Sequence, residues 1–452
     1  MEILESALAG DINKIIDKTT QARYYWTADI HNPNEKVSVL KVVSIDSKSD
    51  YEENFTDEIV IKVLVPGGQY AYKIFPYLDN LELTLYKFDA YSNNYEQVDG
   101  AKSISNERYV ATVINPPASS VEMNTRIKPT ESALDISSFV ELKIQLINKA
   151  VDQMRMRTFG NIFRNCYAHD IIRSVLTSQC RLIDVSSEYL PKGVDIIPIS
   201  KPVKRDHILI PQDTRLVDVP DYIHRKCGGV YPTGLSYYYY RNMWYVFPSY
   251  DTTRFDTTAK TMSIINVPAK NMPGMEKTFI VEGNHTTIIA TGNTKVVNAS
   301  EELILNKGNG VRFANADGFL ESFVETSNNK ALASRGRTNN EFITMKRGNG
   351  NNNVMVSSSK ITANSLYEYS KLAARDGVMM MLNWENSNPD IIYPGMPVRL
   401  KYLEDDEIKE VDGVVLKTHN YIQLAGDGLL TNRHLCTTSI ALFIKRSIFK
   451  NS

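Results

Sequence analysis

The stretch Glu58-Ile-Val-Ile-Lys-Val-Leu-Val65 is rich in β-branched residues and stops at Pro66-Gly67-Gly68. Because Val and Ile favour strands and a Pro-Gly-Gly sequence ends them in a turn or loop, a strand is predicted here. Farther along, Leu81-Glu-Leu-Thr-Leu-Tyr-Lys87 alternates with the period of two that places one strand face on a core. Arg108-Tyr-Val-Ala-Thr-Val-Ile114 adds another strand. Short strands separated by turn signals predict an antiparallel barrel or sandwich in the N-terminal quarter.

The C-terminal part of the chain returns to strand patterns over residues 394–403, 413–423 and 437–446, which predicts a second barrel-like unit. Between the two β regions, residues 140–146 alternate as a strand does, and residues 169–180 carry the apolar stripe of an amphipathic helix. We therefore expect a mainly β fold with minor α, in which two antiparallel barrels flank an inserted middle α/β region.

Four segments are expected along the chain. A domain is discontinuous in sequence where strands from both ends of the chain combine in it. The segments are an N-terminal barrel over 1–127, a mixed strand and helix region over 128–215, a middle β-rich insertion with long loops over 216–360, and a C-terminal β region over 361–452. Brief helices are also expected at residues 11–18, 218–228 and 364–377.

The densest aromatic segment is Val230 to Pro248, which predicts two strands joined by a tight turn at Arg241-Asn242. Tyrosine is in excess throughout, with 25 Tyr against 15 Phe and 3 Trp. Alternation sends consecutive tyrosines to opposite faces, so cross-strand packing in a core or subunit interface is favoured over a stacking platform for sugars or bases. Candidate interface residues are Tyr238, Tyr240 and Trp244.

The net charge indicates no long-range electrostatic field that would attract nucleic acid or an anionic membrane. The cysteine content indicates no disulfide framework. Lys plus Arg total 51 and Asp plus Glu total 52, and four scattered cysteines form no CxxC pair. The beginning of the sequence lacks the features of a signal peptide, and no stretch reaches about 20 apolar residues. We therefore expect a reducing compartment and no membrane partner.

No motif in the sequence predicts catalysis or a cofactor. The seven histidines show no HExxH spacing, and the cluster of His419, His434 and Cys436 is interpreted as packing rather than as a metal site. Gly426-Asp-Gly428 lacks the third glycine of a dinucleotide fingerprint. Asp405-Asp406 lies in an expected turn rather than in a carboxylate pair. The expectation is a non-enzyme without catalytic, cofactor-binding or metal-binding residues.

A set of segments in order along the chain resembles the baseplate hub proteins of contractile-tailed bacteriophages. The segments are Phe159-Gly-Asn-Ile-Phe-Arg-Asn165; Thr214, Leu216, Val219, Pro220, Tyr222, Ile223 and Gly229; Val230-Tyr-Pro-Thr-Gly234; Trp244-Tyr-Val-Phe247; Pro394-Gly-Met-Pro-Val398; and Val411-Asp-Gly-Val-Val-Leu416. The N-terminal region matches that family by architecture alone.

The resemblance implies a structural virion protein with two tail-tube-like barrels per chain. Three chains would form a homotrimeric ring that adapts the sixfold tail tube to the threefold central spike, in a baseplate assembled in the host cytoplasm. Implied partners are the tail tube, central spike, tape measure and baseplate wedge proteins, with DNA passing through the lumen without specific binding. A tail-associated cell-wall hydrolase and a glycan-binding tail module remain as alternatives.

Overall fold

We describe the protein from a computed structural model. The residues that it describes are 10–17, 24–89, 103–114, 139–199, 202–227, 229–231, 233–267, 277–292, 297–298, 311–313, 332–333, 340–342, 377–404, 407–426 and 433–445. The expected long loops over 305–360 and the expected helix over 364–377 lie almost entirely outside them.

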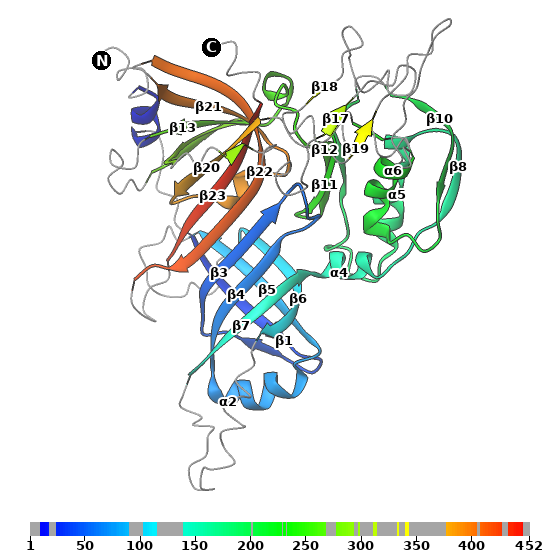
Figure 1. The fold of residues 1–452 in the computed structure, drawn as a ribbon. Helices are drawn as coiled ribbons and strands as arrows, with labels where there is room; N and C mark the ends of the chain where they lie inside the picture. Colours follow the sequence, from blue (N-terminus) through cyan, green and yellow to red (C-terminus); the bar gives the residue numbers. More distant parts are fainter. Residues whose placement is uncertain are drawn as a thin grey trace, which may run out of the picture.

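The N-terminal strands form most of a closed barrel, called barrel 1 (Figure 1). Its strands are β1 (Tyr24–His31), β3 (Lys41–Asp50), β4 (Glu58–Pro66), β5 (Leu81–Asp89), β6 (Ser105–Ile114) and β7 (Phe139–Asn148), with β2 (Lys36–Ser38) paired to β1. The pairing order is β3-β4-β7-β6-β5-β1. Short helical turns follow β4 at α2 (Gly67–Gln69), η1 (Tyr70–Ile74) and η2 (Phe75–Tyr77). The predicted strands at 58–65, 81–87 and 108–114 therefore coincide with β4, β5 and β6.

A second ring of strands, barrel 2, lies beside the first. It is built from β13 (Thr261–Asn266), β14 (Phe279–Glu282), β15 (His285–Ala290), β20 (Gly377–Glu385) and β21 (Pro397–Glu404), with the short turns η6 (Phe255–Thr257) and η8 (Pro389–Ile391). An isolated bridge from Thr291 to Asn383 joins the end of β15 to β20 and closes the ring. Barrel 2 differs from the expected antiparallel unit in that β13 runs parallel to both β15 and β21.

Two long C-terminal strands, β22 (Glu407–Leu424) and β23 (His434–Lys445), run through both barrels. Residues 417–423 of β22 pair with β3 of barrel 1, whereas residues 407–414 pair with β21 of barrel 2. In β23, His434 pairs with Tyr24 of β1, and residues 437–445 pair with β20. Each barrel is therefore completed by the same two strands (Figure 1).

The sequence of β23 shows why it suits this double role. Its first half alternates buried and half-buried residues, which fits a strand with one face on the core of barrel 1. From Ile440 to Ile444 every residue is buried. Leu442 points into the core of barrel 2, while Phe443 packs on the opposite face against Tyr250. A continuous apolar run of this kind is expected where both faces of a strand are covered.

The middle region sits at the side of the two barrels and has its own core (Figure 1). Its helices are α4 (Lys149–Arg155), α5 (Ala168–Ser178), η4 (Gln179–Leu182), η5 (Leu216–Asp218) and α6 (Val219–Lys226). Its strands are β8 (Asn161–Tyr167), β9 (Gly193–Ile196), β10 (Lys204–Ile210), β11 (Leu235–Tyr240) and β12 (Met243–Pro248). The short strand β16 (Val297–Asn298) pairs with β20 of barrel 2, whereas β17 (Val311–Phe313), β18 (Leu332–Ala333) and β19 (Asn340–Phe342) form a separate three-stranded sheet.

Three large apolar clusters therefore account for most of the buried side chains, and each contains one of the three tryptophans. Trp26 lies in the core of barrel 1, Trp244 in that of the middle region and Trp384 in that of barrel 2. The middle core spans residues 150–246, so the expected boundary at 215/216 runs through it. The mainly β fold with minor α is confirmed. In the described part of the chain, no helix combines the length and apolarity required to cross a membrane.

The expected N-terminal helix is present at residues 10–17 and contacts barrel 2. Ile15 is fully buried in a cluster with Ile265, Ile280 and Ile289 on the outer face of that barrel. Lys14 pairs with Glu282 at 2.7 Å. The helix over residues 10–17 thus packs on barrel 2, which is built from strands of the C-terminal half of the chain.

Candidate functional site

The aromatic hairpin β11–β12 forms a wall between the middle region and barrel 2. On one face, Tyr239 lies opposite Trp244, and both belong to the middle core. On the other face, Tyr238 lies opposite Tyr245, and both pack against the core of barrel 2. Alternation along the two strands therefore divides the rings between two cores, as the period of a strand requires.

The three candidate interface residues have different surroundings. Tyr238 and Trp244 have 0% exposed surface, so in this conformation their rings are core residues of the chain rather than surface contacts. Tyr240 is half-buried and faces a cavity at the tip of the hairpin. Both faces of the hairpin are covered within the chain, so Tyr238 and Trp244 pack in cores, and the interface role of the three residues stays a prediction.

The tip of the hairpin is the expected tight turn, and it carries a charged side chain toward the barrels. Arg241 and Asn242 have φ values of 50° and 60°, the left-handed conformation of both central residues in a type I′ turn. The Arg241 guanidinium forms an ion pair with Asp390 of η8, the turn between β20 and β21. Tyr240 lies beneath the same guanidinium, 5.2 Å from ring centroid to Cζ.

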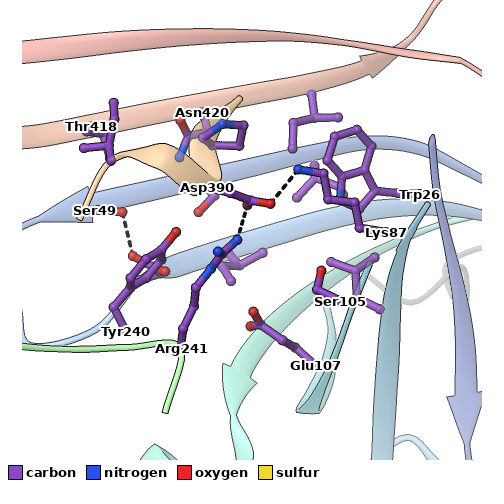
Figure 2. A pocket seen from close by; sticks show the side chains of 18 of the residues that line it. Trp26, Ser49, Lys87, Ser105, Glu107, Tyr240, Arg241, Asp390, Thr418 and Asn420 are labelled. Carbon is purple, nitrogen blue, oxygen red and sulfur yellow. Dashed lines mark hydrogen bonds and ion pairs between the residues drawn. The ribbon is translucent and has the colours of Figure 1, made fainter. Parts of the chain in front are cut away.

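Asp390 also binds a buried lysine of barrel 1. Lys87 Nζ lies 2.6 Å from Asp390 Oδ2 and donates to Asn388 Oδ1 at 3.0 Å. The Lys87 side chain is 4% exposed, and its ammonium lies 3.9 Å from the ring centroid of Tyr24. Burial lowers the pKa of Lys87, while the Asp390 carboxylate opposes that shift. Figure 2 shows Lys87 and Arg241 converging on Asp390 from different elements.

A second buried acid, Asp57, also lines the same cavity. Its Oδ1 accepts hydrogen bonds from Ser49 Oγ at 2.6 Å and from the Tyr238 hydroxyl at 2.7 Å. Burial raises the pKa of Asp57 to about 6, although these two hydrogen bonds favour the ionised form. Tyr51 packs edge-on against Tyr238, with ring centroids 4.8 Å apart. The β3–β4 connection is therefore fastened to the hairpin.

These groups surround a cavity of about 100 Å³ where barrel 1, the hairpin and η8 meet. Its wall includes further polar residues from barrel 1 and from β22, namely Ser47, Ser105, Glu107, Thr418 and Asn420. Carboxylates and cations are both present, and each acid discussed above is bonded to a neighbour in the chain. The arrangement is that of a polar joint between three folded units (Figure 2).

The histidine and cysteine side chains that could serve metal binding or nucleophilic chemistry are buried or bonded to other groups of the chain. His434 accepts from the Trp26 backbone N–H and contacts the Val42 carbonyl oxygen through Nε2 at 2.8 Å, and burial lowers its pKa to about 4. Burial raises the pKa of the Cys436 thiol to about 11. His419 pairs with Asp46 at 2.8 Å. Among the described residues, no group of three His, Cys, Asp or Glu side chains could hold a metal ion.

Sequence reasoning missed Lys87, Asp390 and Asp57. A signal for one of them was present, because Leu81, Leu83 and Lys87 share the inward phase of β5 and a lysine in that phase must find a buried partner. The partner, Asp390, is 303 residues away in the chain. No local pattern identifies it.

Comparison with known proteins gives solved structures of low sequence identity. No family model matches the sequence, and no curated protein matches it. The tail protein from Neisseria meningitidis MC58 aligns over 93% of this chain and 96% of its own at 9% identity and a TM-score of 0.47.

Two further solved structures carry similar descriptions. The 43 kDa tail protein of prophage MuSo2 from Shewanella oneidensis aligns over 93% of this chain and 98% of its own, at 7% identity and a TM-score of 0.47. Prophage tail protein gp18 from Listeria monocytogenes EGD-e aligns over 94% and 96%, at 10% identity and a TM-score of 0.40. All three of these solved structures are described as tail proteins.

Proposed function

We propose that this chain is a structural hub protein of a contractile phage tail baseplate. The observation that carries the proposal is the pair of barrels fused through β22 and β23, because a chain with two barrels supplies six barrels when three copies form a ring. In such a ring, a threefold axis relates the three chains, and an approximate sixfold axis relates their six barrels. It would therefore join a sixfold tail tube to a threefold central spike.

The way that each barrel is built supports a role in assembly. The strand pairings of each barrel return to their starting strand, so interior strand edges are paired within the chain. Contacts between copies are then free to use barrel exteriors and the middle region. The partners that follow are two further copies of the chain, the tail tube protein, the central spike protein, and the tape measure and wedge proteins.

The glycan-binding alternative loses its main support, because Tyr238 and Trp244 have no exposed ring surface on which a sugar could stack. Among the described residues of the polar joint, the acids Asp57, Glu107 and Asp390 are each engaged by neighbouring side chains, so the joint gives the hydrolase alternative no support. We therefore place the chain in the virion tail as a structural protein.

Localisation in tail particles tests the proposal. We would add an affinity tag to the chain, assemble particles in an infected host and label the tag for electron microscopy. Label confined to the tube end that carries the spike supports a hub, and particles made without the chain should lack an assembled baseplate. Label along the tube or sheath, or none on particles, would contradict the proposal.

A further inference from the structure

Strand β22 passes from one barrel to the other at an irregular residue. Its register with β23 shifts between Val415 and Lys417, and pairing with β3 of barrel 1 begins at Lys417. The carbonyl oxygen of the bulged residue, Leu416, accepts from the Tyr51 backbone N–H at 2.9 Å. A β-bulge bends its strand and increases the local twist, so the Leu416 bulge is a pivot between the barrels.

Beside this pivot the barrels do not share a continuous apolar core. Their cores form separate clusters, and the space near the joint is the 100 Å³ cavity, whose wall combines charged and hydroxyl groups with apolar side chains. Close-packed apolar interiors have few voids and resist relative movement of their walls. Around a cavity, relative movement is resisted by the ladder of β22 and β23 and by the specific pairs that cross the joint.

Two of the pairs that cross the joint meet at Asp390, in addition to the hydrogen bond from Tyr238 to Asp57. The Asp390 carboxylate, on barrel 2, binds Lys87 of barrel 1 and Arg241 of the hairpin. Arg241 occupies a position with φ of 50°, where asparagine, aspartate or glycine is favoured and arginine is strained. The turn itself gives no reason for an arginine, whereas the reach of the guanidinium to Asp390 does.

We propose that Lys87, Asp390 and Arg241 form a clamp that fixes the angle between barrels 1 and 2 about the pivot at Leu416. With the clamp closed, one angle is held. With it open, the barrels stay folded and joined by β22 and β23 but sample a range of angles. The inference concerns a single chain and does not depend on the proposed ring.

Spin-label distance measurement on the full chain tests the clamp. Cysteines would replace the exposed residues Lys143 on β7 and Val281 on β14, after Cys166 and Cys227 are changed to Ser. The parent should give one narrow distance distribution. Asp390→Asn should broaden it or shift its maximum, while circular dichroism stays unchanged.

A matched control is Asp256→Asn, which removes an ion pair with Arg399 within barrel 2 and should leave the distance distribution unchanged. If Asp390→Asn gives the same distance distribution as the parent, as the control Asp256→Asn should, the clamp is refuted.

A second variant keeps the test decisive if Asp390→Asn fails to fold because Lys87 is left without its carboxylate. Arg241→Gly relieves the strain at the positive φ and leaves Lys87 paired with Asp390. A clamp predicts a broader distribution for this variant. If Arg241 serves only the turn, the variant should instead be folded, with equal or higher stability and the narrow distance distribution of the parent. That result would overturn the proposal.

Discussion

Replacement of Asp57 by Asn should make the protein more stable at neutral pH. Asp57 receives both of its hydrogen bonds at Oδ1, from Ser49 and Tyr238, and an asparagine Oδ1 can accept the same two. The substitution therefore keeps the geometry and removes the charge. What changes is the cost of holding an ionised carboxylate in a buried position.

The size of the effect follows from the pKa. Burial raises the pKa of Asp57 to about 6 in the folded chain, against an ordinary value of 3.8. Because the folded state binds this proton more tightly, stability is highest below about pH 4 and falls as the pH rises through 6, by about 3 kcal/mol in all. The asparagine variant has no such loss, so its advantage should grow from near zero at pH 4 to about 3 kcal/mol at pH 8.

Urea unfolding of both proteins at fixed ionic strength from pH 4 to pH 8, followed by tryptophan fluorescence, measures this difference. Taking the difference between the two proteins cancels all other titrating groups that they share. A constant difference across the range would refute the burial argument for Asp57. Lower stability of the variant at pH 8 would show instead that the ionised carboxylate is held by a favourable pair.

Three further predictions concern the cores and their junction. Trp244→Ala should lower the free energy of unfolding of the middle region by about 3–5 kcal/mol in urea, since the ring is fully buried. His434→Gln should remove a loss of about 3 kcal/mol between pH 6.5 and 4, because the lowered pKa of buried His434 makes protonation favour the unfolded chain; acid titration of unfolding checks this. Gly395→Ala should lower the melting temperature, because φ is 69° and a Cβ would lie 2.4 Å from the Phe247 ring.

Local patterns sufficed for the elements whose residues pair with near neighbours. The hairpin and its turn at Arg241-Asn242 were predictable because alternation and turn chemistry act over a few residues. The same holds for β4, where the alternating burial of Ile59 to Val65 follows the sequence directly.

Long-range pairing was not predictable in the same way. Tyr24 meets His434 across 410 positions of sequence, and nothing near either residue specifies the other. The double use of β22 depends on a bulge at Leu416 that no glycine or proline marks. The site depends on the same distant contacts, since Lys87 and Asp390 come together only when both barrels are formed.

Two fused barrels per chain should allow three chains to build a ring. Sedimentation of the purified chain at micromolar concentration, with negative-stain class averages of the same sample, measures whether such a ring forms. We predict a species of three times the chain mass whose averages show a closed ring with six barrel-sized lobes. A chain that stays monomeric across the concentration range, or that forms open filaments instead of closed rings, would show that it does not build a three-chain hub.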